Sequence, residues 1–203
     1  MKHETIERNI AIMIIFIVIA ISFGGLAEIL PLLFQKQVTE ADPNLKPLQA
    51  LALAGRDIYI REGCHVCHTQ MVRALYSDTK RYGPYVEAGE QVYEHPFLWG
   101  SKRIGPDLAR VGKRYTDLWH QLHLLNPRSV VPTSIMPSFP WLSTTPLEKN
   151  SIANKMRALR RVGVPYSEAQ INDAENAIQD KTELTALIAY LQQLGTLKSL
   201  QND

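Results

Sequence analysis

Residues 55–73 read GRDIYIREGCHVCHTQMVR, and they contain both cysteines of the chain, Cys64 and Cys67, followed directly by His68. This C-x-x-C-H pattern is the attachment signature of c-type haem. Two thiols three positions apart at the end of a helix can reach the two vinyl groups of one porphyrin, and the next imidazole then lies over the iron. The stretch therefore predicts one covalent haem c on Cys64 and Cys67, with His68 as an axial ligand.

Other uses of two cysteines fit the sequence less well. A disulfide between positions this close would close too short a loop to stabilise a fold. A thioredoxin-like dithiol follows a strand and opens a helix, whereas this pair follows a predicted helix in a chain without strand patterns. A structural zinc site needs a second ligand pair, and His120 with His123 is the only candidate. The cysteines are therefore assigned to a cofactor.

A low-spin electron-transfer haem needs a second axial ligand, and Met136 is the best candidate. It lies in the Pro-bounded segment PTSIMP at 132–137, an irregular loop that can place a thioether over a flat ring. Methionine ligation raises the reduction potential relative to two histidines, which suits a carrier that feeds a strong oxidant. The remaining methionines lie on the anchor side, too close to His68, or in a charged helix: Met1, Met13, Met71 and Met156. Three histidines that lie in no such loop are rival ligands: His95, His120 and His123. His120 and His123 are expected on a helix surface or at a partner contact.

A third pattern, RIGPDL at 103–108, lies between these two. The second ring nitrogen of a metal-bound histidine is usually held by a carbonyl, which fixes the ring, and the Gly-Pro turn can offer the carbonyl of Pro106. Arg103 is expected to pair with a haem propionate through its guanidinium. Leu108 is expected to line the haem pocket.

The first forty residues differ sharply from the rest. From Ile10 to Ala27 no residue is charged, and after Glu28 the apolar character resumes as far as Phe34. A helix over 10–34 would span about 37 Å, compared with roughly 30 Å of hydrocarbon in a bilayer. A cleaved signal peptide would have a shorter apolar run that ends in small residues. The sequence therefore predicts an uncleaved transmembrane helix.

Two charged features of the sequence each have more than one interpretation. Glu28 stays hydrated near the membrane interface, has a functional role or faces a partner helix. A basic segment near 147–162 forms a solvated face or contacts a partner or lipid headgroups through its cations: Lys155, Arg157, Arg160 and Arg161. Charge does not settle the orientation of the span, because basic residues flank both ends: Lys2, Arg8, Lys36 and Lys46.

The composition excludes several classes of protein. The 203 residues include 22 basic and 20 acidic side chains, and the net charge of +2 lacks the basic surface that nucleic-acid binding requires. Hydrophobic residues make up 45%, which is enough for a buried core and argues against a disordered chain. The mean hydropathy of -0.14 averages an apolar anchor with a water-soluble domain.

The predicted fold class is mainly α, with a single N-terminal transmembrane helix followed by a helical haem domain. We expect four segments: an N-terminus at 1–9, the transmembrane helix at 10–34, a linker at 35–47 and a globular domain at 48–203. Apolar spacing and capping signals predict the helices of the domain. They are 48–63, ended by Gly63; about 115–125; the basic helix near 147–162; one after Ser167, capped with Gln170; and one from a capping box of Asp180 and Glu183 to Gly195.

The order of helix, C-x-x-C-H, G-P-D-L, Met-Pro and C-terminal helix resembles a class I cytochrome c domain. In that fold the first and last helices cross, so Gly55 and Tyr190 are expected at their contact. The whole chain resembles the monohaem subunit (subunit II) of cbb3-type haem-copper cytochrome c oxidases. The resemblance covers the anchor and three strings: GRDIYIREGCHVCHTQMVR at 55–73, YGPYVEAGEQVYEHPFLWGSKRIGPDL up to 108, and NPRSVVPTSIMPSFPWL up to 142.

The resemblance implies an electron-transfer subunit. Its haem, bound by Cys64 and Cys67 and ligated by His68 and Met136, would take electrons from a dihaem or soluble cytochrome c. It would pass them to haem b of a catalytic subunit, where oxygen is reduced at a haem and copper with proton pumping. The family also implies a calcium ion near that subunit's haem propionates, which Ser101 could approach.

The resemblance also implies a membrane topology. Three other classes of membrane-anchored protein are alternatives to it. Bacterial c-type haem is attached outside the cytoplasm, which places the domain in the periplasm and the helix in the inner membrane. A nitric oxide reductase small subunit would lack the insertion at 76–103 and the helices at 147–179, and cytochrome c1 carries its anchor after the haem domain. A membrane-tethered thiol-disulfide protein would have free thiols and no visible absorption.

Overall fold

The structure of the chain is a computed structural model that describes residues 3–35, 40–148 and 151–199. It separates into two compact units, one comprising Met1–Ala41 with Glu87–Val92, and the other Asp42–Val86 with Tyr93–Asp203. Within the described residues the secondary structure is helical, apart from one isolated bridge between Pro146 and Thr182. This confirms the predicted mainly α fold class. Part of the predicted linker, 36–39, lies outside the described residues.

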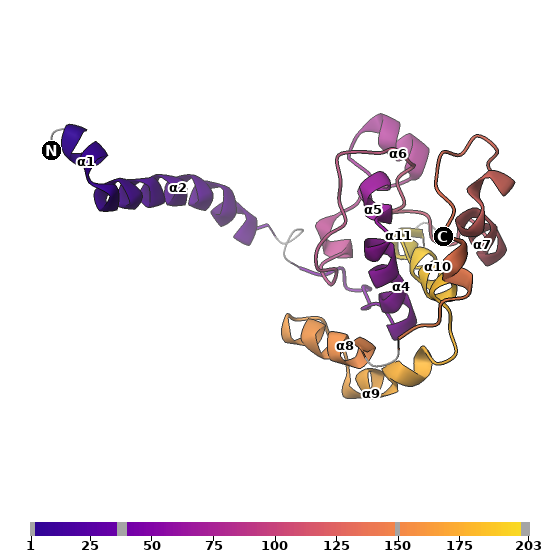
Figure 1. The fold of residues 1–203 in the computed structure, drawn as a ribbon. Coiled ribbons are helices and arrows are strands. Elements are labelled where there is room, and N and C mark those ends of the chain that lie inside the picture. The colour runs from indigo at the N-terminus through magenta and orange to yellow at the C-terminus, as the bar shows by residue number, and fades with distance from the viewer. Residues whose placement is uncertain (1–2, 36–39, 149–150, 200–203) are drawn as a thin grey trace. The chain divides into compact units, whose positions relative to one another are not determined.

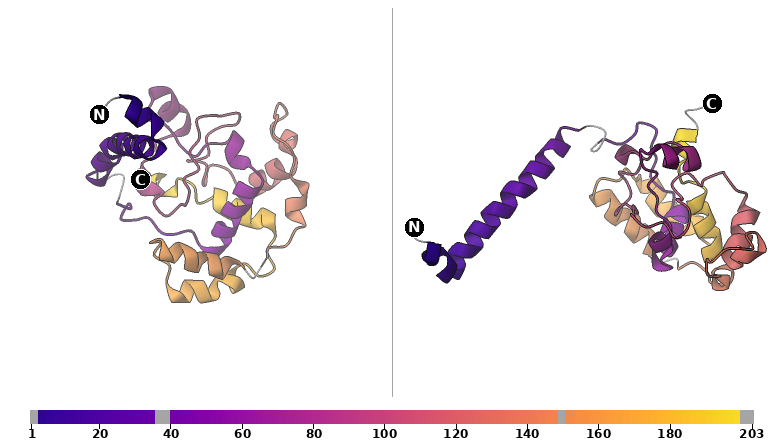
Figure 2. Two further views of the ribbon diagram at one scale, coloured as in Figure 1. Left: turned by 60° about the vertical axis from the view of Figure 1, so that its left-hand side comes forward. Right: turned by 90° about the horizontal axis from the view of Figure 1, so that it is seen from above.

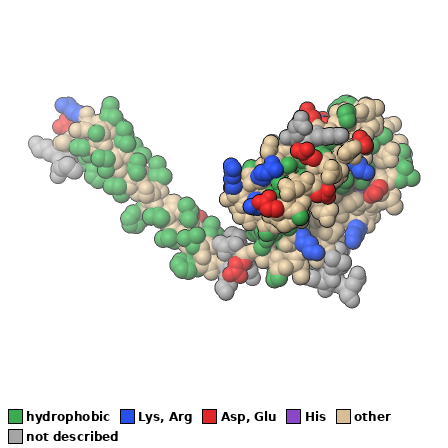
Figure 3. All heavy atoms as spheres, turned by 90° about the horizontal axis from the view of Figure 1, so that it is seen from below, with side chains coloured by type: hydrophobic (Ala, Val, Ile, Leu, Met, Phe, Trp, Pro, Cys, Tyr) green, Lys and Arg blue, Asp and Glu red, His purple; other side chains and the backbone are tan. Residues whose placement is uncertain are grey.

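The first unit contains the candidate membrane span. After α1 (His3–Arg8), Asn9 caps α2 (Ile10–Leu33) by accepting a hydrogen bond from the Ile12 backbone N–H at 3.2 Å. α2 is one long helix (Figure 2), and apolar side chains cover it (Figure 3). Its 24 residues reach about 36 Å, and it is the one helix in the described part of the chain that is long and apolar enough to cross a membrane. Because α2 buries no residue, it differs from the core helix of a soluble protein and matches a single-pass anchor. The short 3₁₀ helix η1 (Ala88–Glu90) also belongs to this unit.

The second unit is built on the crossing of α4 (Ala50–Arg61) with α10 (Glu183–Leu191), which lie side by side in Figure 1. Gly55 allows the close approach, because a methyl group there would overlap the backbone carbonyl of Ala186 and press on the Tyr190 side chain. The predicted contact between Gly55 and Tyr190 is confirmed. Ala186 is an additional close neighbour that the sequence did not indicate.

A second layer of two helices, α8 (Ile152–Arg161) and α9 (Glu168–Ala177), packs against α4. α8 is shorter than the predicted basic helix, of which residues 149–150 lie outside the described part of the chain. Its apolar face is buried and includes Met156, which is 1% exposed. Lys155 is half-buried and forms an ion pair with Asp57 of α4. The other three cations of α8 are exposed, as a solvated face requires: Arg157, Arg160 and Arg161.

The predicted capping box of Asp180 and Glu183 is wrong. The residue that caps α10 is Thr182, whose side chain accepts a hydrogen bond from the backbone in the first turn. Glu183 is drawn away by Arg61 of α4, and its two carboxylate oxygens each lie 2.6 Å from a guanidinium nitrogen. Glu183 thus forms an ion pair between the two crossing helices, and Thr182 caps α10 in place of Asp180.

Short elements and loops complete the second unit. The predicted capping box of Ser167 and Gln170 at the start of α9 is confirmed. The helix predicted at about 115–125 is α7, which begins at Asp117. The remaining elements are α5 (Cys64–Cys67), α6 (Tyr76–Tyr82), α7 (Asp117–Leu125), η2 (Pro127–Ser129), η3 (Pro140–Ser143) and α11 (Thr196–Ser199).

Candidate functional site

The two cysteines lie on α5, a single helical turn that starts after Gly63. Gly63 has a φ of 72°, a left-handed conformation that favours glycine, and it turns the chain from α4 into α5. Cys64 and Cys67 are half-buried and both are free thiols. Burial raises the pKa of the Cys64 thiol to about 12, and the charge of Glu62 adds to the effect. Such a thiol is a poor redox nucleophile, because thiol-disulfide exchange needs the thiolate.

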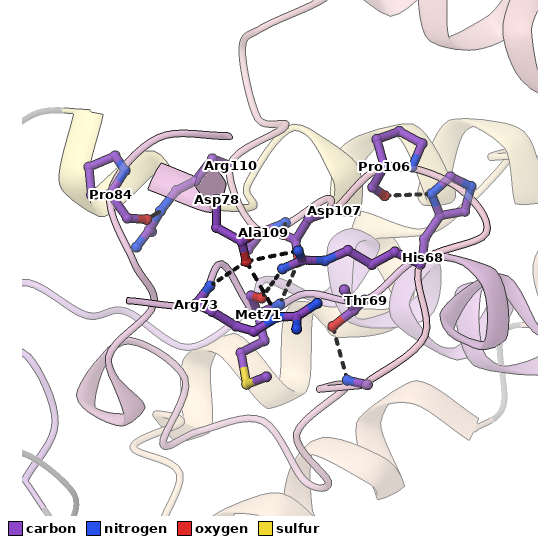
Figure 4. A network of polar contacts seen from close by, with 12 residues as sticks. His68, Thr69, Met71, Arg73, Asp78, Pro84, Pro106, Asp107, Ala109 and Arg110 are labelled. Atoms are coloured by element: carbon purple, nitrogen blue, oxygen red, sulfur yellow. Dashed lines mark hydrogen bonds and ion pairs between the residues drawn. The ribbon is translucent and has the colours of Figure 1, made fainter. Parts of the chain in front are cut away.

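His68 follows α5, and the loop at 103–108 orients its ring. The ring Nδ1 lies 2.8 Å from the carbonyl oxygen of Pro106 and donates its hydrogen there (Figure 4). Nε2 is then the nitrogen that can bind a metal. Burial lowers the pKa of His68, which favours the neutral ring that a metal requires. The contact with Pro106 predicted from the Gly-Pro turn is therefore present.

Gly105 lets this loop approach the ring closely. A methyl group at Gly105 would overlap ring atoms of His68. The backbone N–H of Gly105 donates to the Cys67 carbonyl at 3.0 Å, and that of Leu108 donates to the Thr69 carbonyl at 2.9 Å. The loop is thus hydrogen-bonded to the chain on both sides of His68.

Arg103 is held by two carboxylates that the sequence did not indicate as its partners. Its Nη1 lies 2.8 Å from Oδ2 of Asp78, and its Nη2 lies 3.4 Å from Oδ2 of Asp107. Nη2 also donates to the Met71 carbonyl at 2.8 Å. Figure 4 shows Met71, Asp78 and Asp107 in this network. These contacts occupy both Nη atoms of Arg103. Its Nε is buried without a hydrogen-bond partner, so only Nε is left for the predicted pairing with a propionate.

Met136 is half-buried and packs against the main core cluster, as Cys64 and Leu108 do. Its backbone N–H donates to Ser134 Oγ at 3.2 Å. The Nη1 atom of Arg128 lies 3.4 Å and 3.5 Å from the carbonyl oxygens of Ser134 and Met136. The structure therefore brings Met136, Cys64 and Leu108 to one core, although they are far apart in the sequence.

The prediction that His120 lies on a helix surface or at a partner contact is wrong, because this residue is buried within the chain. His120 is 3% exposed, because α7 turns this residue inward, and His123 is half-buried. Trp119 stacks on His123 with ring centroids 4.6 Å apart and on Tyr115 at 4.0 Å. His120 Nε2 and His123 Nδ1 are buried without a hydrogen-bond partner. Buried polar atoms without partners are costly, so these two nitrogens are available to a water molecule or a ligand.

A family model described as Cytochrome C oxidase, mono-heme subunit/FixO matches residues 3–184. The chain belongs to this family. A comparison with curated proteins found no match. Membership of the mono-heme subunit family implies one haem c and association with other oxidase subunits in a membrane complex. It confirms the resemblance seen in the sequence.

The residues of this mono-heme subunit fit a haem c. Two free thiols lie one helical turn apart, and His68 directly after them has its Nδ1 occupied. Gly105 leaves room for the ring of His68 because it has no side chain. The available donors, nitrogen and thioether sulfur, are those that haem iron takes in cytochromes c.

Ser101, the predicted calcium contact of this mono-heme subunit, is exposed. The preceding residue, Gly100, donates its N–H to Thr69 Oγ1 at 2.9 Å, which ties this segment to the residue after His68. In the described part of the chain, no group of three or more His, Cys, Asp or Glu residues is placed to hold a metal ion. A carboxylate cluster around a calcium ion at Ser101 would therefore have to include residues of another subunit.

Proposed function

We propose that this mono-heme subunit relays single electrons from a c-type cytochrome donor to haem b of the catalytic subunit of a cbb3-type oxidase. The donor is a dihaem cytochrome c subunit or a soluble cytochrome c. The observation that carries the proposal is the hydrogen bond from His68 Nδ1 to the Pro106 carbonyl, directly after two free thiols. This arrangement orients an axial histidine on a covalently attached haem.

Each residue of the site has one role in this proposal. Cys64 and Cys67 hold the haem covalently, and His68 and Met136 are its two axial ligands. When bound, the haem supplies a one-electron iron couple, whose potential methionine ligation raises. Leu108 packs on the same core cluster as Met136 and helps to exclude water from the site.

The proposal assigns oxygen reduction to a partner subunit. Reduction of oxygen to water takes four electrons, whereas a single haem holds one. α2 contains no histidine, so this span has no ligands for a haem-copper centre within the membrane. Proton pumping therefore also belongs to the catalytic subunit that receives the electrons.

We place the haem domain in the periplasm and α2 in the bacterial inner membrane. Attachment of c-type haem outside the cytoplasm supports this topology. The short N-terminal segment then lies in the cytoplasm, where Lys2 and Arg8 agree with the excess of cations on that side. Ser101 would face the interface with the catalytic subunit and contribute one oxygen to a calcium ion there.

Purification of the intact oxidase through an affinity tag on this chain tests the proposal. A reduced-minus-oxidised spectrum should show a c-type α band, and haem should remain on the 23.0 kDa chain after denaturation. The co-purifying large subunit should contain haem b and copper. The double variant Cys64→Ser/Cys67→Ser is the control and should lose the covalent haem.

Two results would contradict the proposal. Absence of a c-type band on the chain would indicate a thiol-disulfide protein or another use of the two cysteines. A co-purifying haem b subunit without copper would indicate a respiratory complex of the nitric oxide reductase type.

A further inference from the structure

We propose that Arg103 is a positioning residue for the axial histidine, acting with Asp78 and Asp107 as a clamp that holds the Pro106 carbonyl on the ring of His68. The inference rests on the proposed function, because it concerns the ligand of the proposed haem. It assigns to Arg103 a role different from that of a propionate partner. In the following, the clamp means Arg103, Asp78 and Asp107.

The first part of the clamp is the buried carboxylate of Asp107. Its side chain has no exposed surface. Oδ2 accepts the backbone N–H of Met71 at 3.0 Å, and Oδ1 accepts that of Ala109 at 2.8 Å. A buried carboxylate needs such partners to offset its desolvation. Asp107 therefore binds the segment after His68 to the loop that contains Pro106.

The second part is the guanidinium of Arg103. Its Nη2 donates to the carbonyl of Met71, so both backbone polar groups of Met71 are held, the N–H by Asp107 and the carbonyl by Arg103. Nη1 pairs with Asp78, and the guanidinium carbon lies 5.2 Å from the ring centroid of Tyr82. Asp78 also accepts the Arg73 backbone N–H at 3.2 Å. A rigid planar fork can make these contacts together, whereas a lysine ammonium cannot.

The position of the clamp connects it to the His68 ring. Asp107 directly follows Pro106, and Met71 lies three residues after His68, so the clamp joins the two segments that form the Nδ1 hydrogen bond (Figure 4). Two backbone hydrogen bonds, from Gly105 to Cys67 and from Leu108 to Thr69, also hold the loop, whereas its exposed side chains, Ile104 and Pro106, add little packing. Loosening the clamp should lengthen the bond from Nδ1 to the Pro106 carbonyl.

The consequence for a bound haem has a definite sign. The hydrogen bond from Nδ1 makes the imidazole a more basic ligand, which stabilises the oxidised iron and lowers the potential. Loss of the clamp should therefore raise the reduction potential. Removal of the positive charge of Arg103 would act in the opposite direction, since it would also stabilise the more positive oxidised iron.

The variant Arg103→Lys separates these two effects because it keeps the charge and removes the fork. In the intact oxidase we expect its haem c to have a higher midpoint potential than the wild type. In the reduced state, nuclear magnetic resonance should show faster solvent exchange of the His68 Nδ1 proton. Arg73→Lys is the matched control, because Arg73 pairs with the same Asp78 through its side chain but is more exposed.

An unchanged potential and an unchanged Nδ1 proton in Arg103→Lys, combined with a lower potential in Arg103→Gln, would overturn the clamp and restore the propionate role. If Arg103→Lys does not accumulate, Asp78→Glu keeps the charge, displaces the same contact and should also raise the potential. Failure of the proposed function is distinguishable, because the wild-type chain would then have no c-type band to titrate.

Discussion

The His68 side of the site is held by more hydrogen bonds than the loop of Met136. Around His68, hydrogen bonds of 2.8–3.0 Å join the ring, its own carbonyl and the following segment to Pro106, Tyr59 and Asp107. In the Met136 loop, the Met136 N–H donates to Ser134 Oγ at 3.2 Å, the Ser134 N–H donates to the Val131 carbonyl at 2.9 Å, and Arg128 makes two long contacts. Its neighbour Ile135 is 80% exposed.

This difference indicates that the two proposed ligands are held in place in different ways. A histidine fixed by backbone and buried charge keeps one orientation, because its Nδ1, its own carbonyl and the backbone N–H of Met71 are each hydrogen-bonded. Met136 has fewer hydrogen bonds around it, so packing against the core and, as the proposed ligand, its bond to the metal would hold it in place. Changes on the His68 side should therefore affect assembly of the site, and changes in the Met136 loop should affect its properties.

The largest effect is expected from Gly105→Ala. The added methyl group would overlap the His68 ring, and overpacking costs about 1–3 kcal/mol, or more where the neighbours cannot move. We expect at least the upper end of that range and little holoprotein, measured as covalent haem per chain. Gly100→Ala is the control, because a methyl group there would make only an ordinary contact of 3.7 Å with Thr69. Normal haem content in Gly105→Ala would show that the His68 side is less rigid than its contacts indicate.

Met136→Ala should have the next largest effect, and mainly on spectrum and potential. The covalent haem should remain, whereas the low-spin Met-His spectrum should be lost and the potential should fall. Because Met136 is half-buried, the free energy of unfolding should decrease by about 1–2 kcal/mol, less than for a fully buried methionine. Retention of the low-spin spectrum would remove Met136 from the ligand set and favour one of the histidines.

Acid should weaken the His68 side through Asp78. Burial tends to raise the pKa of Asp78, but the hydrogen bonds and charges of Arg103 and Arg73 lower it overall. An acid whose pKa is lowered on folding stabilises the protein above its unfolded value, near 3.8, and this stabilisation disappears as the pH falls through the folded value. The stability difference between wild type and Asp78→Asn should therefore shrink below about pH 4 in urea titrations.

The control for this titration is Asp173→Asn, since Asp173 is an exposed residue of α9 outside the clamp. A difference for Asp78→Asn that stays constant down to the acid transition would show that Arg103 does not hold the Asp78 carboxylate in its charged form.

The smallest effect is expected from Arg128→Ala in the Met136 loop. Its contacts to the two carbonyls are 3.4 Å and 3.5 Å long and exposed, so the stability should change by less than about 0.5 kcal/mol. The low-spin spectrum should remain. The rate at which an added ligand replaces Met136 on the iron should change only slightly. A loss of methionine ligation in this variant would show that Arg128 holds the loop, and the contrast with the His68 side would disappear.

Features that depend on neighbouring residues could be predicted from the sequence. The C-x-x-C-H pattern, the turn at Pro106 and the cap at Ser167 each involve a few adjacent positions with fixed backbone requirements. The contact between Gly55 and Tyr190 required the family resemblance as well, because it joins helices at opposite ends of the domain.

Features set by tertiary packing could not be predicted. Asp78 reaches Arg103 only because α6 folds back on the loop, and no motif marks it. On α7, His120 is buried while Leu118 is 63% exposed, the reverse of what the side chains alone suggest. The orientation of that helix is decided by the core it packs on, which a single sequence does not specify.

The burial of Cys64 has a consequence for how the protein is made. In the folded chain this thiol is shielded and its pKa is near 12, so it would be almost entirely protonated at neutral pH. Thioether formation at Cys64 needs access for the attachment machinery and a reactive sulfur. We therefore expect haem to be attached while the chain is still open, before α4 closes on α10.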